Sequence, residues 1–132
     1  MTAFFADTFY WVALTGTDDP AHERAMALSR SLTPEKIITT DDVLCEYLAF
    51  FADARSHVRF EAGEIVAELI EDPDMRVVPH SQETFLAGLR LYRARPDKGY
   101  SLVDGISMQT DVLTNDRHFE QEGFRALFRD LT

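Results

Sequence analysis

Four acidic residues occupy positions where a carboxylate is structurally awkward. Asp7 ends the apolar run AFFAD, Glu46 interrupts VLCEYLAFF, Asp104 follows KGYSLV, and Asp116 ends DVLTND. Asp7 and Asp116 come directly after short β-like runs, and ligand sites of parallel α/β sheets open at the carboxyl ends of strands. We therefore expect the four acids to form one metal-binding carboxylate cluster.

The chemistry of such a cluster follows from its donor atoms. Carboxylates without accompanying His or Cys clusters form hard oxygen sites, which suit Mg²⁺ or Mn²⁺ rather than zinc or copper. Without a cation, several carboxylates in one pocket would repel one another and stay partly protonated. Two divalent ions about 4 Å apart can activate a water and stabilise both the attacking and the leaving oxygen of a phosphodiester. The reaction class that fits is metal-assisted phosphodiester hydrolysis.

Three of the acids also have a purely structural interpretation. Asp7 could cap the helix that follows it, and Asp116 could cap a helix beginning at Arg117; taken singly, capping is the favoured interpretation for both. Asp104 fits the second half of a capping box with Ser101. The residue types alone therefore leave both interpretations open.

Glu46 has the weakest structural explanation. It lies in a predicted helix over residues 41–54, whose apolar residues cover most of the circumference, so we expect this helix to be largely buried. A lone buried carboxylate is costly and must be paired, protonated or ligating. Asp42 shares its face one turn earlier, an unfavourable like-charged spacing unless something positive lies between. We interpret Asp42 as a partner of the helix dipole rather than a ligand.

Other polar residues could add ligands or contacts around the acids, although helix capping is their common role. These residues are Thr8, Ser101, Thr114 and Asn115. His118 has no second His at ligand spacing, which favours a surface or capping role over a metal or phosphate contact.

Cys45 and the N-terminal aromatic residues are predicted to be mainly structural. Cys45 is interpreted as a small buried hydrophobe, because a nucleophilic thiol needs a nearby base. The aromatic group is expected mostly in the core, although Tyr10 or Trp11, near Asp7, could stack a base. The whole aromatic group is Phe4, Phe5, Phe9, Tyr10 and Trp11.

Length and composition limit what the cluster can belong to. A chain of 132 residues, 45% apolar and with ten Phe, is enough for one domain (1–132) with a real core. The net charge of −10 argues against nucleic acid unless cations fill the carboxylate cluster. A single cysteine excludes an intramolecular disulfide and fits a reducing cytosol. No run approaches a membrane span and no signal peptide is visible, so we expect a soluble, cytoplasmic protein.

Strands and helices alternate along the chain, which predicts a parallel sheet covered on both faces. A cap at Asp19 with Pro20 at the first helical position opens the second helix, and Ser81 caps the helix that carries Phe85, Leu89 and Tyr92 toward the core. The predicted strands are 4–6, 36–39, 75–78 and 112–114, with a possible edge strand at 126–128. The predicted helices are 8–15, 20–30, 41–54, 58–71, one after Ser81, and 117–122.

Four segments together resemble a known family. The segments FADT, IITTDDVLCEYL, DKGYSLVDGISM and DVLTNDRHFEQEGF look like those of the PIN-domain ribonucleases, most closely the VapC-type toxins of type II toxin–antitoxin systems. The resemblance covers nearly the whole chain. It implies a three-layer α/β PIN-like domain with a mostly parallel sheet of four to five strands flanked by helices. It places the family's acidic site on Asp7, Glu46, Asp104 and Asp116, with Thr8, Thr114 and Asn115 nearby.

The resemblance also implies the activity and the partners. The expected activity is an Mg²⁺- or Mn²⁺-dependent endoribonuclease that leaves 5′-phosphate and 3′-hydroxyl ends. The expected partners are an RNA substrate, a small VapB-like antitoxin and a second copy of the chain as a homodimer, with no membrane. Among basic residues, Arg95, Lys98 and Arg117 flank two of the site acids and could contact RNA.

One departure from the family leaves a different function open. Only ISMQT separates Asp104-Gly105 from Asp111, and the stretch from Gly99 to Asp111 barely supplies the dozen or so residues that a helical crossover needs. A spoiled site would favour a non-catalytic PIN module that binds a protein partner. A phosphate-transfer domain with Asp7 as acceptor is a third interpretation, but the acidic pair or late Lys that it needs is lacking.

Overall fold

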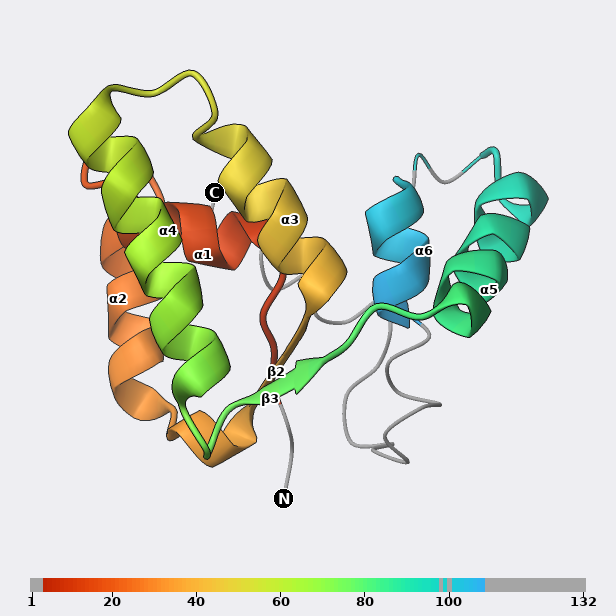
Figure 1. Ribbon diagram of the computed structural model, residues 1–132, viewed down its shortest axis with the longest axis horizontal. Helices are drawn as coiled ribbons and strands as arrows, with labels where there is room; N and C mark the ends of the chain where they lie inside the picture. The colour runs from red at the N-terminus through yellow and green to blue at the C-terminus, as the bar shows by residue number, and fades with distance from the viewer. Residues whose placement is uncertain (1–3, 98, 100, 109–132) are drawn as a thin grey trace.

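The computed structural model describes residues 4–97, 99 and 101–108. The elements in chain order are β1 (Phe4–Phe5), α1 (Thr8–Thr15), α2 (His22–Ser31), η1 (Pro34–Lys36), β2 (Ile37–Thr40), α3 (Asp41–Phe50), α4 (Ser56–Glu71), β3 (Arg76–Val78), α5 (Gln82–Ala94) and α6 (Leu102–Met108). Helices α2 and α4 lie on one side of the strands, and α5 with α6 lies on the other (Figure 1). The alternation of apolar runs and amphipathic segments has produced the expected α/β architecture.

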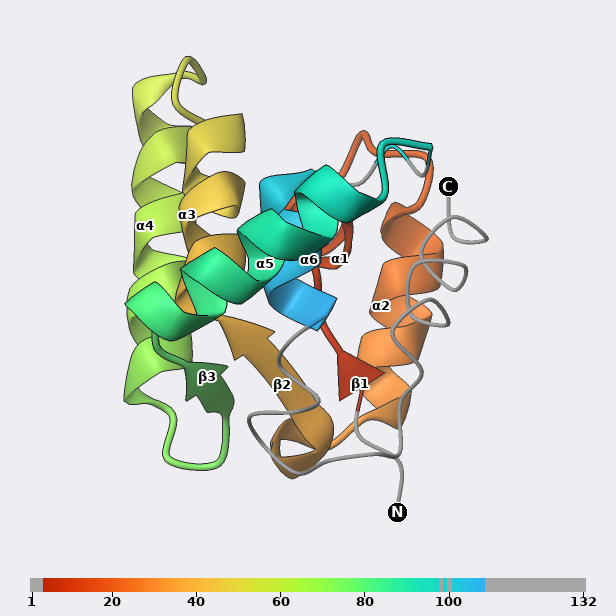
Figure 2. The same cartoon turned by 90° about the vertical axis from the view of Figure 1, so that its right-hand side faces the viewer.

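The described sheet has three parallel strands in the order β1-β2-β3. Phe5 is opposite Ile38 in the first pair, and Thr40 is opposite Val78 in the second. Figure 2 shows the strands running side by side, with α5 crossing in front of α6. The predicted strands 112–114 and 126–128 and the predicted helix 117–122 lie outside the described residues. Because the strands are parallel, their carboxyl ends meet at one edge.

The chain turns almost directly from strand into helix at the ends of β1 and β2. Asp7 caps α1 by accepting a hydrogen bond from the Tyr10 amide, and Thr40 caps α3 by accepting one from Val43. These caps satisfy amides that a helix start leaves without a partner inside the helix. Each junction thus fixes the first helical turn directly over the sheet edge.

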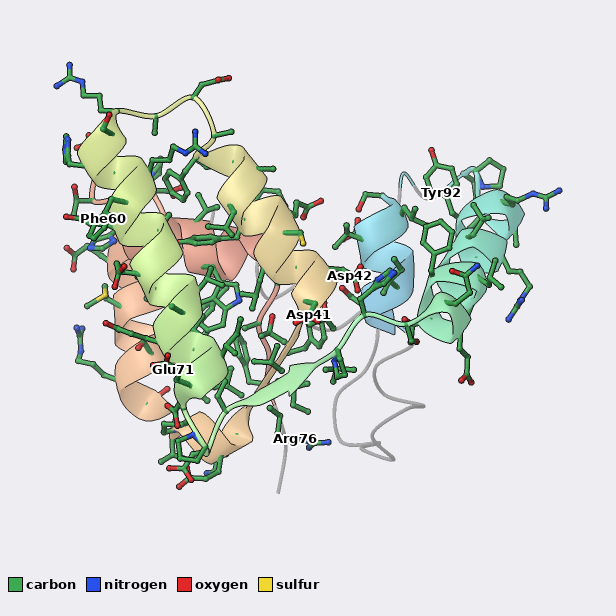
Figure 3. The ribbon with its side chains drawn as sticks, viewed as in Figure 1. Asp41, Asp42, Phe60, Glu71, Arg76 and Tyr92 are labelled. Carbon is green, nitrogen blue, oxygen red and sulfur yellow. The ribbon has the colours of Figure 1, made fainter. Side chains whose placement is uncertain are left out.

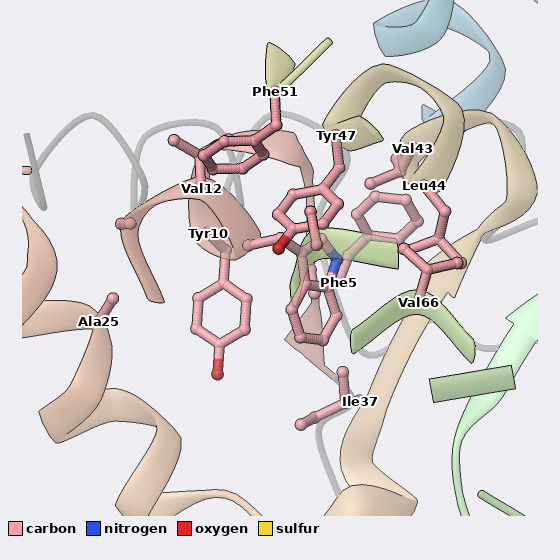
Figure 4. Close-up of a cluster of buried hydrophobic side chains, with 14 of the residues drawn as sticks. Phe5, Tyr10, Val12, Ala25, Ile37, Val43, Leu44, Tyr47, Phe51 and Val66 are labelled. Atoms are coloured by element: carbon pink, nitrogen blue, oxygen red, sulfur yellow. The ribbon is translucent and has the colours of Figure 1, made fainter. Parts of the chain in front are cut away.

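The core lies where α1, α3 and the strands meet (Figure 4). Its largest buried side chains include Phe5, Tyr10 and Tyr47, and the Tyr47 ring packs edge-on against Phe51 with centroids 5.3 Å apart. Burying one such side chain contributes about 1.5–3 kcal/mol. Thr39, also fully buried, donates to the Ala6 carbonyl and accepts from the Trp11 indole, which joins β2, β1 and α1.

Helices α5 and α6 approach each other closely at Gly88 and Gly105, where the Ile106 side chain and the backbone of both helices meet. A Cβ added at Gly105 would lie 2.7 Å from the Gly88 carbonyl oxygen, and one added at Gly88 would lie 2.7 Å from the Ile106 amide nitrogen. Real Cβ atoms do not approach backbone so closely, so glycine is required at both positions. The close contact sets the position of α6 and hence of Asp104.

Several sequence-based boundaries and burial predictions are corrected by the structure. The second helix begins at His22 rather than Pro20, because Asp19 accepts a hydrogen bond from the Ala21 amide in a turn that precedes the helix. Helix α3 ends at Phe50 rather than at residue 54, and it is buried along one face only, with Phe50 itself 64% exposed. Helix α3 has more apolar residues than its neighbouring elements can bury, so some of them remain exposed to solvent.

Helix α5 only partly faces its neighbours with the expected residues. Phe85 and Leu89 are half-buried, Tyr92 is exposed, and the fully buried residues are Thr84 and Gly88. The predicted cap at Ser81 is confirmed, and it forms a reciprocal capping box with Thr84. Small residues occupy the buried face because α6 approaches so closely. Within the part of the chain that the structure describes, no helix is long and apolar enough to cross a membrane.

Candidate active site

Asp7 lies where β1 gives way to α1, as the sequence predicts. Its side chain is buried at 8% exposure, and Oδ1 accepts from the Tyr10 amide at 3.2 Å. The capping role and a role at the sheet edge are compatible, because a carboxylate has two oxygens and several lone pairs. The carboxylate also lies at the positive end of the α1 dipole, where a negative charge is attracted.

Glu46 reaches α1 from α3. The Thr8 hydroxyl donates a hydrogen bond to Glu46 Oε1, and Thr8 is the residue next to Asp7. Glu46 is half-buried rather than enclosed, because α3 is covered on one face only. The predicted need for a partner is met by a neutral hydroxyl, which fixes the carboxylate without cancelling its charge.

Asp42, one turn before Glu46 on α3, has a partner of its own. Asp42 Oδ1 lies 2.7 Å from His80 Nδ1, and the neighbouring Asp41 Oδ2 accepts from the His80 backbone N–H at 3.1 Å. Figure 3 shows Asp41 and Asp42 at the start of α3, on the side toward α6 and the end of β3. The unfavourable spacing of Asp42 and Glu46 is therefore relieved by two separate donors, His80 and Thr8.

His80 is the residue at this edge that the sequence analysis missed. It follows β3 after Pro79, so it stands at the carboxyl end of the third strand as Asp7 stands at that of the first. The rule about strand ends points to His80 as well, because it closely follows the predicted strand 75–78. His80 is the basic component of the described edge of the sheet.

Asp104 lies in the first turn of α6. The Ser101 amide donates to Asp104 Oδ2 and the Asp104 amide donates to Ser101 Oγ, both at 3.0 Å, so the predicted capping box is present. Helix α6 packs against both α5 and α3. Val103, the preceding residue, packs against the main core cluster. Asp104 therefore lies on a helix that is held in place by packing against α3 and the main core.

The predicted site acids offer oxygen donor atoms at this edge, and oxygen is the kind of ligand that Mg²⁺ and Mn²⁺ prefer. Among residues 4–97, 99 and 101–108, however, no group of three or more His, Cys, Asp or Glu side chains is arranged to hold a metal ion. The fourth predicted acid, Asp116, lies outside the described residues. The same is true of Lys98, Thr114, Asn115, Arg117 and His118.

The predictions for Cys45 and Phe9 are wrong. Cys45 is exposed, because it lies on the uncovered side of α3. Tyr10 and Trp11 are buried in the core as mainly expected, which removes the alternative that either stacks a base. Phe9, expected in the core, is 66% exposed, because the buried face of α1 starts at Tyr10.

Comparison with known proteins identifies the fold to which these residues belong. The family model described as PIN domain matches residues 4–123. The chain belongs to the PIN domain family. A solved structure of Mycobacterium tuberculosis VapC20, titled as a sarcin–ricin loop cleaving toxin, superposes with a TM-score of 0.76 at 22% sequence identity and covers 95% of each chain. That similarity supports the same PIN fold. No curated protein matches the chain.

Proposed function

We propose that this PIN domain is a VapC-like endoribonuclease that hydrolyses RNA phosphodiester bonds with Mg²⁺ or Mn²⁺. The observation that carries the proposal is the pairing of Thr8 with Glu46 beside Asp7, which brings two carboxylate-bearing elements of a PIN domain to one strand end. Asp104 approaches on α6, which packs against the helix that carries Glu46. Asp116 is the fourth acid of the proposed site.

In this proposal Asp7, Glu46, Asp104 and Asp116 would hold the cation. A bound divalent ion supplies a water of lowered pKa and neutralises charge on the phosphodiester. Thr8 orients the Glu46 carboxylate by its hydrogen bond, and the Tyr10 amide fixes one oxygen of Asp7. The Ser101 amide holds Asp104 Oδ2 in the same way. Hydrolysis by water leaves a 5′-phosphate and a 3′-hydroxyl, without use of the RNA 2′-hydroxyl.

The biological setting is part of the proposal. A VapC-like role implies a small VapB-like antitoxin that covers the acidic pocket, a homodimer, and action on RNA in the cytoplasm. A small antitoxin gene next to this reading frame would support that role. A non-catalytic PIN module is the second candidate, and the observation that favours it is the lack of a three-acid group within the described residues.

Metal dependence is tested first by stability and cleavage together. Ions that bind only the folded site raise its stability by mass action. The thermal midpoint should therefore rise in millimolar Mg²⁺ or Mn²⁺ and return with chelator, and cleavage of a structured RNA should require the same ions. NaCl at equal ionic strength serves as the control. An unchanged midpoint together with uncleaved RNA would favour the non-catalytic module.

RNA binding by an acidic protein is tested with an inactive variant. The net charge of −10 removes general attraction to phosphate, so binding should depend on cations and on local residues such as Arg95, Lys98 and Arg117. Asp7→Asn should bind RNA weakly, more tightly with Mg²⁺ than with NaCl of equal ionic strength, and less tightly when Lys98→Ala is added. Strong binding in EDTA would contradict this account.

A further inference from the structure

His80 is held firmly although its side chain is 49% exposed. Its backbone N–H donates to Asp41 Oδ2 at 3.1 Å, its ring nitrogen Nδ1 is 2.7 Å from Asp42 Oδ1, and its ring lies edge-on to Phe85 with centroids 6.2 Å apart. Two of these contacts hold the ring and the third holds its backbone, while half of the side chain stays in contact with solvent. An ordered and exposed polar ring is well suited to meet a ligand.

The Asp42 contact selects the tautomer of the neutral His80 ring. A carboxylate accepts hydrogen bonds, so Nδ1 carries the proton of the pair. A neutral imidazole that donates from Nδ1 has a lone pair at Nε2, and Nε2 is then a hydrogen-bond acceptor. Within the described part of the chain, no residue bonds to Nε2 of His80.

The position of His80 relates it to the proposed site. Strand order β1-β2-β3 places the carboxyl end of β3 two strand spacings from that of β1, which is about 10 Å. Asp42, the partner of His80, lies four residues before Glu46, and residues at that spacing share one helix face. A nucleic acid strand laid along the sheet edge from Asp7 therefore passes His80.

The surroundings of His80 favour a neutral donor over a phosphate. The two groups that contact it, Asp41 and Asp42, are both carboxylates, which repel a phosphate oxygen. A ribose 2′-hydroxyl carries no charge, so its own contact with Nε2 adds no such repulsion, provided that the flanking phosphates of the strand lie away from the two carboxylates. The 2′-hydroxyl is also the group that distinguishes RNA from DNA.

We propose that His80 Nε2 accepts a hydrogen bond from a ribose 2′-hydroxyl of the bound strand, so that His80 determines preference for RNA over DNA. This inference rests on the proposed function, because it requires a nucleic acid strand at the acidic edge. It assigns to the end of β3 a role in choosing the substrate, next to the acids proposed for the chemistry.

Two substitutions of His80 distinguish its proposed contact with the substrate from its hydrogen bond to Asp42 on α3. His80→Asn places an amide near the position of Nδ1, which keeps a donor for Asp42 but removes the acceptor at Nε2. His80→Gln reaches farther and can place its amide oxygen near the position of Nε2. His57→Asn, at an exposed position on α4, is the matched control. The backbone bond to Asp41 survives in all three variants.

The experiment measures affinity for one oligonucleotide as RNA and as its 2′-deoxy form, by fluorescence anisotropy in an Asp7→Asn background with Mg²⁺. His80→Asn should weaken RNA binding about five- to tenfold, the worth of one good hydrogen bond, and leave the 2′-deoxy form unchanged. His80→Gln should retain most of the RNA preference, and His57→Asn all of it. Urea midpoints of the variants should match that of the parent.

The possible outcomes decide between the two proposals. Equal weakening of RNA and DNA by His80→Asn would indicate a phosphate contact or an indirect effect, and unchanged RNA preference would remove His80 from the substrate path; either overturns the inference. Cleavage by the wild-type chain is measured separately on the same RNA. If the wild type does not cleave RNA but its RNA preference depends on His80, the proposed nuclease activity is wrong and the His80 contact stands. If the wild type cleaves RNA but its RNA preference does not depend on His80, the nuclease activity stands and the His80 contact is wrong.

Discussion

Two regions place the acids of this PIN domain by different physical means. Asp7 and Glu46 are placed by strand ends, caps and side-chain hydrogen bonds over a core of large aromatic residues. Asp104 is placed by a helix whose backbone touches that of α5 at Gly88 and Gly105. In the first region many separate contacts together hold the acids in place. In the second region the position of Asp104 depends on the absence of a Cβ atom at Gly88 and Gly105. A small change should therefore affect the two regions very differently.

Glu46→Gln should produce the largest effect on cleavage with the least effect on folding. The amide keeps the volume and its oxygen can still accept from Thr8, so the contact between α1 and α3 survives. Loss of the charge should lower single-turnover cleavage about 100- to 1,000-fold. The free energy of unfolding in urea should stay within about 0.5 kcal/mol of wild type. Retained cleavage would remove Glu46 from the proposed site.

Gly105→Ala should damage both activity and stability. Its Cβ would lie 2.7 Å from the Gly88 carbonyl oxygen, and backbone cannot move aside as a flexible side chain can. Overpacking of this kind costs about 1–3 kcal/mol, and a shift of Asp104 by about 1 Å would lower cleavage about 100-fold. Urea unfolding and single-turnover cleavage measure the two effects.

The matched control is Gly63→Ala on α4, where an added Cβ meets nothing within 4 Å. Replacing an exposed helical glycine by alanine should stabilise the protein by about 0.5–1 kcal/mol and leave cleavage unchanged. If Gly105→Ala behaved like Gly63→Ala, the close contact between α5 and α6 would not be what places Asp104.

Tyr47→Phe should produce the smallest effect, because it removes one of the many contacts that stabilise the core region. Thr15 donates to the Trp11 carbonyl, so Tyr47 donates to Thr15 across 2.6 Å. Loss of that hydrogen bond should cost about 1 kcal/mol at neutral pH, measured by urea unfolding. Cleavage should remain at the wild-type rate because the site acids do not move.

The same variant carries a pH test. Burial raises the pKa of the Tyr47 hydroxyl above its ordinary value of 10.0. The unfolded chain therefore loses this proton first, so the associated stability is complete below pH 10 and is lost as the pH rises through the folded-state pKa. Above pH 10, the unfolding free energy of Tyr47→Phe should fall less steeply than that of wild type. Identical slopes would show that Tyr47 does not contribute to alkaline unfolding.

Local features of the fold were predictable from the sequence because local chemistry determines them. Phe4–Phe5 and Ile37–Thr40 form strands because apolar and β-branched runs precede capping residues. Ser81 and Ser101 cap helices as their spacing predicts. The order of β1, β2 and β3 in one parallel sheet also agrees with the alternation of elements.

The features that were missed depend on which elements meet. The exposed side of α3 cannot be inferred from its own apolar residues, since exposure depends on what covers them. The requirement for glycine at positions 88 and 105 arises only when α5 and α6 cross. His80 differs from these features, because it closely follows a predicted strand as Asp7 does and the sequence therefore carries a signal for it. The assembly of all four predicted acids stays a prediction, because Asp116 lies outside the described residues.

The exposed position of Cys45 has a practical consequence. It is the only cysteine in the 132-residue chain, and it lies on α3 directly before Glu46. The natural sequence therefore offers one accessible thiol for a fluorophore or spin label, one residue from a proposed catalytic carboxylate, with no cysteine to remove or introduce. A label there would report the arrival of a metal ion, an RNA strand or an inhibitory protein at the same edge of the sheet.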